Sequence, residues 1–135
     1  MSKEQTLSII KPDAVERNLI DDIKNTFKKN NLKIKEDKKI HLTKEEAAEF
    51  YRVHQSKSFY DQLCSYLSSG PIVAIILEGE NSVKLNRELM GATDPKKAEE
   101  NTIRKLYGIS IDKNSVHGSD SVENAKKEID FFFKN

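Results

Sequence analysis

The run Ile72-Val73-Ala74-Ile75-Ile76-Leu77 is the longest apolar stretch of the chain. Its length suits a β-strand, and a strand that is apolar at every position is typically covered on both faces. The run is far shorter than the roughly 20 residues that a membrane-spanning helix needs. We therefore expect residues 72–77 to form a central strand, with the rest of the chain arranged around it.

The first part of the chain predicts a strand and then a helix. Residues 6–10 alternate briefly and predict a strand that stops at Lys11-Pro12. One amphipathic helix should follow and end at Asn30-Asn31, because asparagine tolerates the left-handed conformation of a helix stop. Its apolar stripe recurs at every fourth position, as Val15, Leu19, Ile23 and Phe27.

Three more elements are expected before the central strand. The lysine-rich stretch 32–40 predicts a long, half-exposed strand whose charges would protect a sheet edge. Thr43-Lys44-Glu45-Glu46 is a capping-box pattern, which predicts a helix that runs through Tyr51. Apolar residues at four-residue spacing predict a further helix over 59–67, closed by Ser69-Gly70-Pro71.

Beyond the central strand, a short helix is expected over 82–90. The segment 91–113 shows little periodicity, and an irregular stretch of that length is more often functional than idle. A short strand should lead to His117, and a last helix should begin at Asp120 or Ser121. Its apolar face would comprise Val122, Ala125, Ile129, Phe132 and Phe133. This order predicts an α+β fold of the βαββαβ type with one sheet, in a single domain over 1–135.

The composition limits the classes of function. Among 135 residues, 23 basic and 22 acidic side chains give a net charge of +1, so no strong overall field attracts nucleic acid or an anionic membrane. The single cysteine, Cys64, permits no intramolecular disulfide, and we expect it to be a buried helix residue in a reducing compartment. The chain starts without a signal-peptide pattern. A cytoplasmic location is therefore expected.

The run Asn114-Ser115-Val116-His117-Gly118-Ser119-Asp120 places a histidine between the end of an expected strand and a helix start. Imidazole is a competent nucleophile near neutral pH. Gly118 lets a ligand approach the ring closely, and the free N–H groups of a helix start favour an anion. These features indicate a nucleophilic His117. On this run alone, a histidine with only local hydrogen bonds in a turn is an equally good interpretation.

Glu128 is a candidate partner for that ring. On the last helix it shares a side with Ala125 and Phe132, so its carboxylate needs a partner. An imidazole N–H would serve, and the contact would hold the histidine in one tautomer with the other nitrogen free to attack. Taken alone, a glutamate that reaches water from the flank of the helix is the commoner arrangement.

Lys11, Arg87 and Arg104 are candidate ligands for phosphate. Lys11 ends a strand, Arg87 shares a helix face with Met90 and can therefore point inward, and Arg104 lies in the irregular segment. Guanidinium groups match the geometry of phosphate, so convergence of these cations near His117 would form an electrostatic clamp. Each arginine alone is more often a surface charge, and the spacing does not establish the convergence.

Other chemistries lack their sequence patterns. The chain has no Walker-type loop, no glycine-rich dinucleotide fingerprint and no cysteine–histidine zinc spacing. We expect the isolated His41 to be structural. An RNA-binding sheet of the βαββαβ type needs aromatic side chains on central strands and a basic surface. Residues 72–77 contain no aromatic side chain, so nucleic acid is not expected as the main ligand.

Taken together, these motifs resemble the nucleoside diphosphate kinase family along nearly the whole chain. The segment 6–15 and the run Asn114-x-x-His117-Gly118-Ser119-Asp120 are similar to family segments, as are Gly91-Ala92-Thr93-Asp94-Pro95 and Thr102-Ile103-Arg104. The resemblance implies a ferredoxin-like fold with a four-stranded antiparallel sheet. It also implies ping-pong transfer of the γ-phosphate of a nucleoside triphosphate, typically ATP, to a nucleoside diphosphate through a phosphohistidine.

The resemblance assigns roles to residues around the phosphates. Nδ1 of His117 would attack, while Glu128, assisted by Ser119, would hold the other ring nitrogen. Mg²⁺ would bridge the substrate phosphates rather than occupy a protein cage. The positions that match contacts to the phosphates or to the transferring group are Lys11, Tyr51, His54, Arg87, Thr93 and Arg104.

The rest of the nucleotide is assigned in the same way. Lys11 and Asn114 match contacts to the sugar hydroxyls, and Phe59 and Ile111 match the apolar pair that sandwiches the base. A base held by stacking would be distinguished weakly, so broad base and sugar specificity is expected. Family members assemble from dimers into tetramers or hexamers, which implies a homo-oligomer here.

A non-catalytic nucleotide- or nucleic-acid-binding module of the same fold is the alternative. The nucleophile, the orienting carboxylate and the phosphate-binding cations argue against it, because a binding module need not retain all three. The chain departs from the family pattern at Val53, Ser58 and Glu100-Asn101. These departures concern the nucleotide cleft and the long loop, and they leave the core set of site residues intact.

Overall fold

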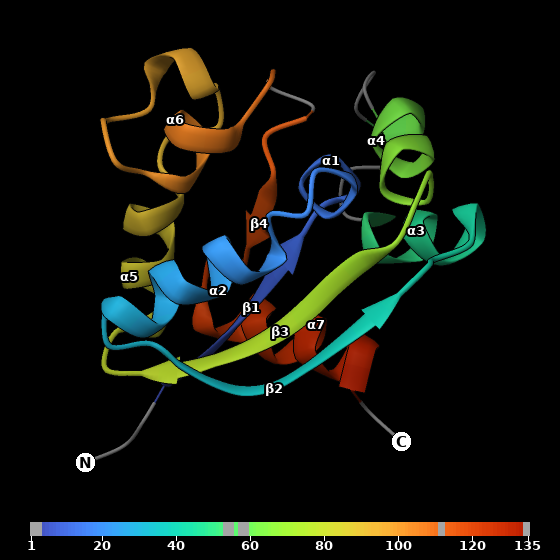
Figure 1. The fold of residues 1–135 in the computed structure, drawn as a ribbon. Coiled ribbons are helices and arrows are strands. Elements are labelled where there is room, and N and C mark those ends of the chain that lie inside the picture. Colours follow the sequence, from blue (N-terminus) through green and yellow to red (C-terminus); the bar gives the residue numbers. More distant parts are fainter. Residues whose placement is uncertain (1–3, 53–55, 57–59, 111–112, 134–135) are drawn as a thin grey trace.

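The computed structural model describes residues 4–52, 56, 60–110 and 113–133, and Figure 1 shows how they are arranged. A four-stranded antiparallel sheet has the strand order β2-β3-β1-β4. Its strands are β1 (Glu4–Ile10), β2 (Lys33–Ile40), β3 (Ile72–Gly79) and β4 (Val116–Gly118). The expected α+β fold of the βαββαβ type is therefore confirmed.

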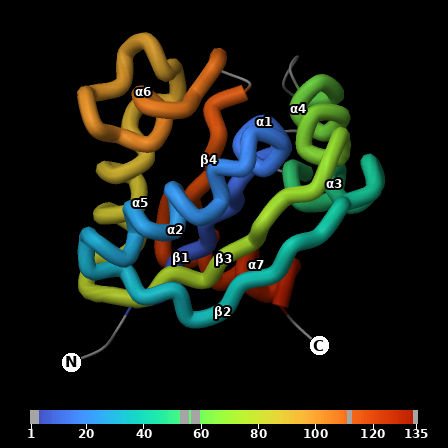
Figure 2. The backbone as a smooth tube through the Cα atoms, in the orientation of Figure 1, coloured from blue at the N-terminus to red at the C-terminus, as the bar shows by residue number. Residues whose placement is uncertain are grey.

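Helices pack against both faces of the sheet (Figure 1). One face is covered by α1 (Pro12–Glu16), α2 (Ile20–Lys29), α5 (Ser82–Met90) and α6 (Ile103–Tyr107). The other is covered by α3 (Lys44–Phe50), α4 (Tyr60–Leu67) and α7 (Val122–Phe133). A short 3-10 helix, η2 (Pro95–Lys97), lies between α5 and α6. In Figure 2, the segment with α6, helix α1 and helix α4 all lie at the upper end of the view.

The run 72–77 forms most of β3 and is the central strand that its composition predicts. Val73 and Ile75 belong to the apolar cluster on one face, whereas Ile72 and Ala74 belong to the cluster on the other. Successive side chains of a strand point to opposite faces, so a strand between two cores must be apolar throughout. β2 lies at the edge of the sheet with most of its side chains exposed, as its lysines predict.

Local chemistry sets two of the predicted helix boundaries. The Thr43 hydroxyl accepts a hydrogen bond from the Glu46 N–H at 3.1 Å, and the Glu46 carboxylate accepts one from the Thr43 N–H at 2.9 Å. This capping box starts α3. At the other boundary α2 ends at Lys29, and Asn31 takes a left-handed φ of 68°. Both predictions are confirmed.

The single amphipathic helix expected through Val15 and Phe27 is wrong. The chain forms two helices, α1 and α2, because Asn18 has a φ of 61° and interrupts the helical path between them. Val15 and Phe27 nevertheless lie in one apolar cluster, with Leu19 packed against it. The four-residue spacing therefore reports a shared buried face and not a continuous helix.

Two further expectations need correction near the C-terminal part of the chain. The segment 91–113 contains η2 and α6, which are too short to show periodicity in the sequence. Val122 does not belong to the apolar face of α7, because it lies in the first turn and is 42% exposed. Ser121 provides the cap of that helix, since its hydroxyl accepts the Asn124 N–H at 3.1 Å.

Within the described part of the chain, no helix combines the length and the apolar character that crossing a bilayer requires. Cys64 is buried on α4, as predicted.

Replacement of Thr43 by alanine tests the capping box. The Glu46 N–H loses its acceptor, so we expect the free energy of unfolding to fall by about 1 kcal/mol in urea denaturation. Thr26→Ala is the matched control, because the Thr26 hydroxyl donates to the Asp22 carbonyl inside α2 and alanine is the better helix former. An equal loss of stability in both variants would contradict the capping assignment.

Candidate functional site

The site is built where β4 pairs with β1. His117 lies opposite Ile9, and Gly118 lies opposite Ser8. His117 is therefore the middle residue of β4, and the expectation that it ends the strand is wrong because Gly118 continues the pairing. Val116 is buried in the cluster beneath α5 and α6. Since strand side chains alternate, the His117 ring projects to the opposite face, toward α3 and α7.

Glu128 on α7 holds the His117 ring. Nε2 of His117 lies 3.1 Å from Oε1 of Glu128, and the same oxygen accepts a 2.7 Å hydrogen bond from the Ser119 hydroxyl. An ionised carboxylate only accepts hydrogen bonds, so the contact favours the tautomer with its proton on Nε2. Nδ1 then keeps its lone pair. The Glu128 side chain is 21% exposed, and its carboxylate turns to His117 and Ser119 instead of extending fully into water.

Aromatic rings at the end of α3 pack against the imidazole. The Phe50 and His117 ring centroids are 5.5 Å apart, and those of Tyr51 and His117 are 6.3 Å apart, both in edge-on geometry. Burial, followed by the charge of Glu128, raises the pKa of the Tyr51 phenol well above its usual value. Tyr51 therefore stays protonated and can donate. Phe50 was not predicted as a site residue, although it directly precedes Tyr51, which was.

Arg104 is a buried cation of the site. It is only 9% exposed, and its guanidinium donates to the Gly91 carbonyl at 3.1 Å and to the Val116 carbonyl at 2.9 Å. Val116 directly precedes His117, so this contact ties the cation to β4. Burial, followed by the nearby charge of Arg87, lowers the pKa of Arg104 to about 10. The guanidinium is therefore still charged at neutral pH.

Arg87 and Arg104 lie in different environments, one exposed and the other buried. Arg87 is exposed, as is commoner for a single arginine, and the alternative that it points inward is wrong. The buried side of α5 comprises Val83, Asn86 and Met90, and Arg87 lies at the margin of that side. Arg104 is not a surface charge, because remote backbone carbonyls accept its hydrogen bonds. The two guanidinium groups nevertheless lie close enough to interact.

The side chains of Lys11 and Asn114 contact each other. The Lys11 ammonium donates to the Asn114 side-chain oxygen at 2.9 Å, and the Asn114 amide donates to the Thr93 carbonyl at 3.1 Å. Lys11 and Asn114 are 5% and 2% exposed. The structure thus brings together β1, the segment that follows α5 and the segment that leads to β4.

Two cavities flank the site. A cavity of about 280 Å³ is lined by His117, Phe50 and Glu128 among others. The second, of about 620 Å³, is lined by Arg87, Thr93 and Arg104 among others. Asp120 lines both cavities, and a hydrogen bond from the Asn124 side chain keeps the pKa of its carboxyl below the usual range. Sequence reasoning missed Asp120 as a site residue, although it closes the run around His117.

Several of the predicted positions lie outside the described residues, namely Val53, His54, Ser58, Phe59 and Ile111. The departure at Glu100-Asn101 is described. Asn101 has a left-handed φ of 70° in the turn before α6. Asparagine is among the non-glycine residues that adopt this conformation most readily. This departure from the family pattern therefore occupies a turn whose left-handed conformation glycine would also adopt.

The contact with Glu128 predicts one tautomer of the neutral His117 ring. In ¹⁵N–¹H correlation spectra of protein labelled at histidine, the proton should reside on Nε2. Glu128→Gln should give a mixture, because an amide can donate as well as accept. Ser119→Ala keeps the carboxylate in place and should retain the Nε2–H form. A ring protonated mainly on Nδ1 in the unsubstituted protein would contradict the geometry.

Known proteins resemble this chain over nearly its full length. The family model described as nucleoside diphosphate kinase matches residues 4–135. The nucleoside diphosphate kinase of Nitratiruptor sp. is 58% identical over 130 residues, which is 96% of this chain and 95% of that protein. That of Persephonella marina is 55% identical over 133 residues, which is 98% of this chain and 95% of that protein.

Solved structures agree. The crystal structure of the Aquifex aeolicus nucleoside diphosphate kinase matches with a TM-score of 0.96 at 42% identity, covering 99% of this chain and 97% of that one. The enzyme from Encephalitozoon cuniculi matches with a TM-score of 0.94 at 36% identity, covering 98% of this chain and 90% of that one. The extent of these matches, together with the geometry around His117, shows that the chain belongs to the nucleoside diphosphate kinase family.

Proposed function

We propose that His117 carries the phosphoryl group from a nucleoside triphosphate, typically ATP, to a nucleoside diphosphate. Membership of the family makes the chain a phosphotransferase. The observation that carries the assignment to His117 is the 3.1 Å contact between its Nε2 and Glu128. That contact orients the ring on a short strand and leaves Nδ1 as the available nucleophile.

The transfer takes two steps. In the first, the Nδ1 lone pair of His117 forms a bond to the γ-phosphorus, and the bond from that phosphorus to the bridging oxygen breaks. The nucleoside diphosphate leaves with the electron pair. The phosphorylated ring is positively charged, and the Glu128 carboxylate stabilises it through the Nε2–H. In the second step a β-phosphate oxygen of another diphosphate attacks the phosphorus, the P–N bond breaks, and the neutral imidazole returns.

Phosphoryl transfer requires mainly alignment and charge neutralisation. Arg87, Arg104 and Lys11 are the cations proposed for the phosphates, with Tyr51 and Thr93 as neighbouring polar groups. Arg104 suits this role because its guanidinium is already fixed by two backbone carbonyls. An ordered cation needs no rearrangement when charge moves toward the leaving oxygen, which is how such a site lowers the barrier.

The sugar and the base are proposed to lie farther from His117. Lys11 and Asn114 are assigned to the sugar hydroxyls, and their mutual 2.9 Å hydrogen bond supports a shared ligand. Phe59 and Ile111 are assigned to the two faces of the base, and His54 to the phosphates. A base held by its faces makes few hydrogen bonds through its edges, so purines, pyrimidines, ribose and deoxyribose should all be accepted.

Mg²⁺ is proposed to be held mainly by the substrate phosphates. The described side chains assigned to the phosphates are chiefly cations and hydroxyl groups, which favour phosphate oxygens rather than a metal ion. Asp120 is a second carboxylate that lines the cavity beside His117, and its lowered pKa keeps it ionised, so it suits a contact through the metal's water shell. This donor set fits an ion that keeps several waters and binds through phosphate oxygens. The ion would neutralise charge on the phosphates during transfer.

We also propose a cytoplasmic homo-oligomer built from dimers, as a tetramer or hexamer. Leu106 and Ile109 support an assembly, because they are 56% and 57% exposed in the segment between α5 and β4. Subunit contact would remove this apolar surface from water. The free, buried Cys64 suits a reducing compartment.

Labelling with ATP that carries ³²P at the γ-position tests the proposal. The folded protein should become a phosphoprotein whose label is lost in acid and kept in alkali, and the label should pass to several nucleoside diphosphates. His117→Ala should abolish labelling. His41→Ala is the matched control and should keep the label, because its ring contacts the Ser68 carbonyl away from the site. A folded wild-type protein that takes no label would refute the proposal.

A further inference from the structure

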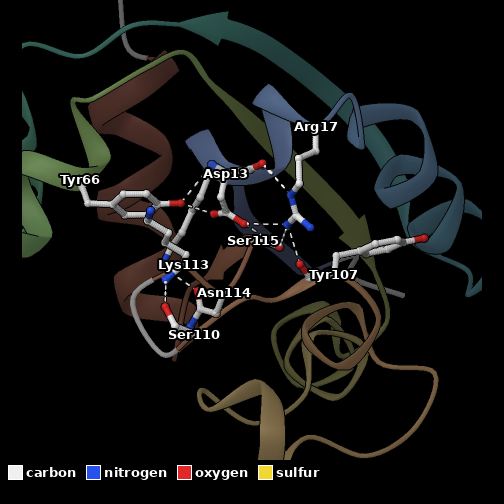
Figure 3. Close-up of polar contacts among 9 residues, drawn as sticks. Asp13, Arg17, Tyr66, Tyr107, Ser110, Lys113, Asn114 and Ser115 are labelled. Atoms are coloured by element: carbon white, nitrogen blue, oxygen red, sulfur yellow. Dashed lines mark hydrogen bonds and ion pairs between the residues drawn. The ribbon is translucent and has the colours of Figure 1, made fainter.

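A buried carboxylate outside the residues assigned so far joins several segments of the chain (Figure 3). Asp13, the second residue of α1, has a side chain only 4% exposed. Its Oδ1 accepts a hydrogen bond from the Tyr66 phenol on α4. Its Oδ2 accepts from the Ser115 hydroxyl at 2.9 Å and from the Arg17 guanidinium at 3.1 Å. Figure 3 shows the carboxylate lying among these donors.

Tyr66 and Arg17 each make a second hydrogen bond with Asp13, through its backbone. The Tyr66 phenol oxygen also accepts from the Asp13 N–H at 3.0 Å. Burial, followed by the hydrogen bond to Asp13, raises the pKa of this phenol, so it remains a donor. Arg17 donates further to the Asp13 carbonyl at 3.1 Å and to the Tyr107 carbonyl at the end of α6 at 2.5 Å. Asp13 thus links α1 with α4 and Ser115, and its partner Arg17 adds the contact with α6.

Ser115 connects this network to the nucleotide site. It is fully buried and has a φ of 75°, in the left-handed region that residues other than glycine rarely adopt. Its carbonyl accepts the Lys11 N–H at 2.8 Å, and the adjacent Asn114 side chain accepts from the Lys11 ammonium at 2.9 Å. The hydrogen bond from Ser115 to Asp13 therefore stabilises the turn that sets Asn114 against Lys11.

We propose that Asp13 is a positioning residue, which acts through Ser115 to hold Asn114 and Lys11 in the geometry that recognises the sugar hydroxyls. The inference rests on the proposed contacts of Lys11 and Asn114 with the sugar. A carboxylate constrains its donors in direction as well as in distance. Loss of this constraint should weaken the preference for a hydroxyl-bearing sugar more than it weakens attack by His117, which Glu128 orients independently.

The test compares ATP with 2′,3′-dideoxy-ATP in single-turnover phosphorylation of His117. In the unsubstituted protein, ATP should react with the larger second-order rate constant. Ser115→Ala removes the hydroxyl that donates to Asp13, and the ratio of the two rate constants should fall about three- to tenfold, the value of roughly one hydrogen bond. Tyr66→Phe is the matched control, because it removes another hydroxyl bound to the same carboxylate and should keep the ratio.

Asp13→Ala should lower the ratio as much as Ser115→Ala does. The double variant should show no further fall in the ratio, because both substitutions break the hydrogen bond between Ser115 and Asp13 on which the ratio is proposed to depend. Asp13→Asn retains an oxygen that accepts from Ser115, so it should keep a ratio near that of the unsubstituted protein. If Asp13→Ala does not fold, the fall expected for Ser115→Ala tests the same hydrogen bond. An equal loss for both nucleotides in Ser115→Ala would show a purely structural role and overturn the proposal. A shifted ratio in Tyr66→Phe would overturn it too.

Asn114→Ala separates this inference from the proposed function. It should remove most of the preference for the hydroxyl-bearing nucleotide. If Asn114→Ala leaves the preference intact, the proposed sugar contact is wrong and the inference falls with it. If Asn114→Ala removes the preference and Ser115→Ala does not, the inference alone is overturned.

Discussion

The antiparallel pairing of β4 with β1 determines where every other group of the site can lie. It sets His117 opposite Ile9, with the ring on the face toward α7 and Val116 on the face toward α5. Ser119 extends the connection, because its N–H donates to the Leu7 carbonyl at 3.1 Å. A shift of one residue in this register would exchange the two faces. The His117 ring would then be buried in the apolar core.

In this molecule, attraction for an anion comes from a few cations placed close together rather than from the total charge. The net charge of +1 gives no long-range attraction for an anion. Arg104 instead places one cation where water is largely excluded, and two backbone carbonyls offset part of the cost of its burial. A charge held in that environment acts more strongly on a nearby phosphate than the numerous exposed lysines of β2 can.

The features predicted from sequence are those whose causes are local. Residues 72–77 are apolar at every position, which by itself indicates a strand buried on both faces. Thr43 and Glu46 are neighbours in sequence and form the helix cap between them. The break at Asn18 was missed, because a four-residue stripe is the same whether or not the helix continues.

The environment of Arg104 was misjudged for a different reason. The burial of Arg104 depends on carbonyls supplied by Gly91 and Val116, which are distant from it along the chain. The contacts of Asp13 with Tyr66 and Ser115 were likewise invisible, because they join segments that come together only in the folded chain. Glu128 was proposed from its place on the last helix, but only the fold shows the distance to His117.

The pairing of Ile9 with His117 also has a consequence for how the protein is made. Closing so long a stretch of chain is entropically unfavourable, and contacts between distant residues slow folding. During translation β1 emerges before β4 and α7. A growing chain can therefore assemble much of its core while the imidazole still lacks Glu128. The contact between His117 and Glu128 therefore forms only when α7 docks against the sheet, because Glu128 lies on that helix.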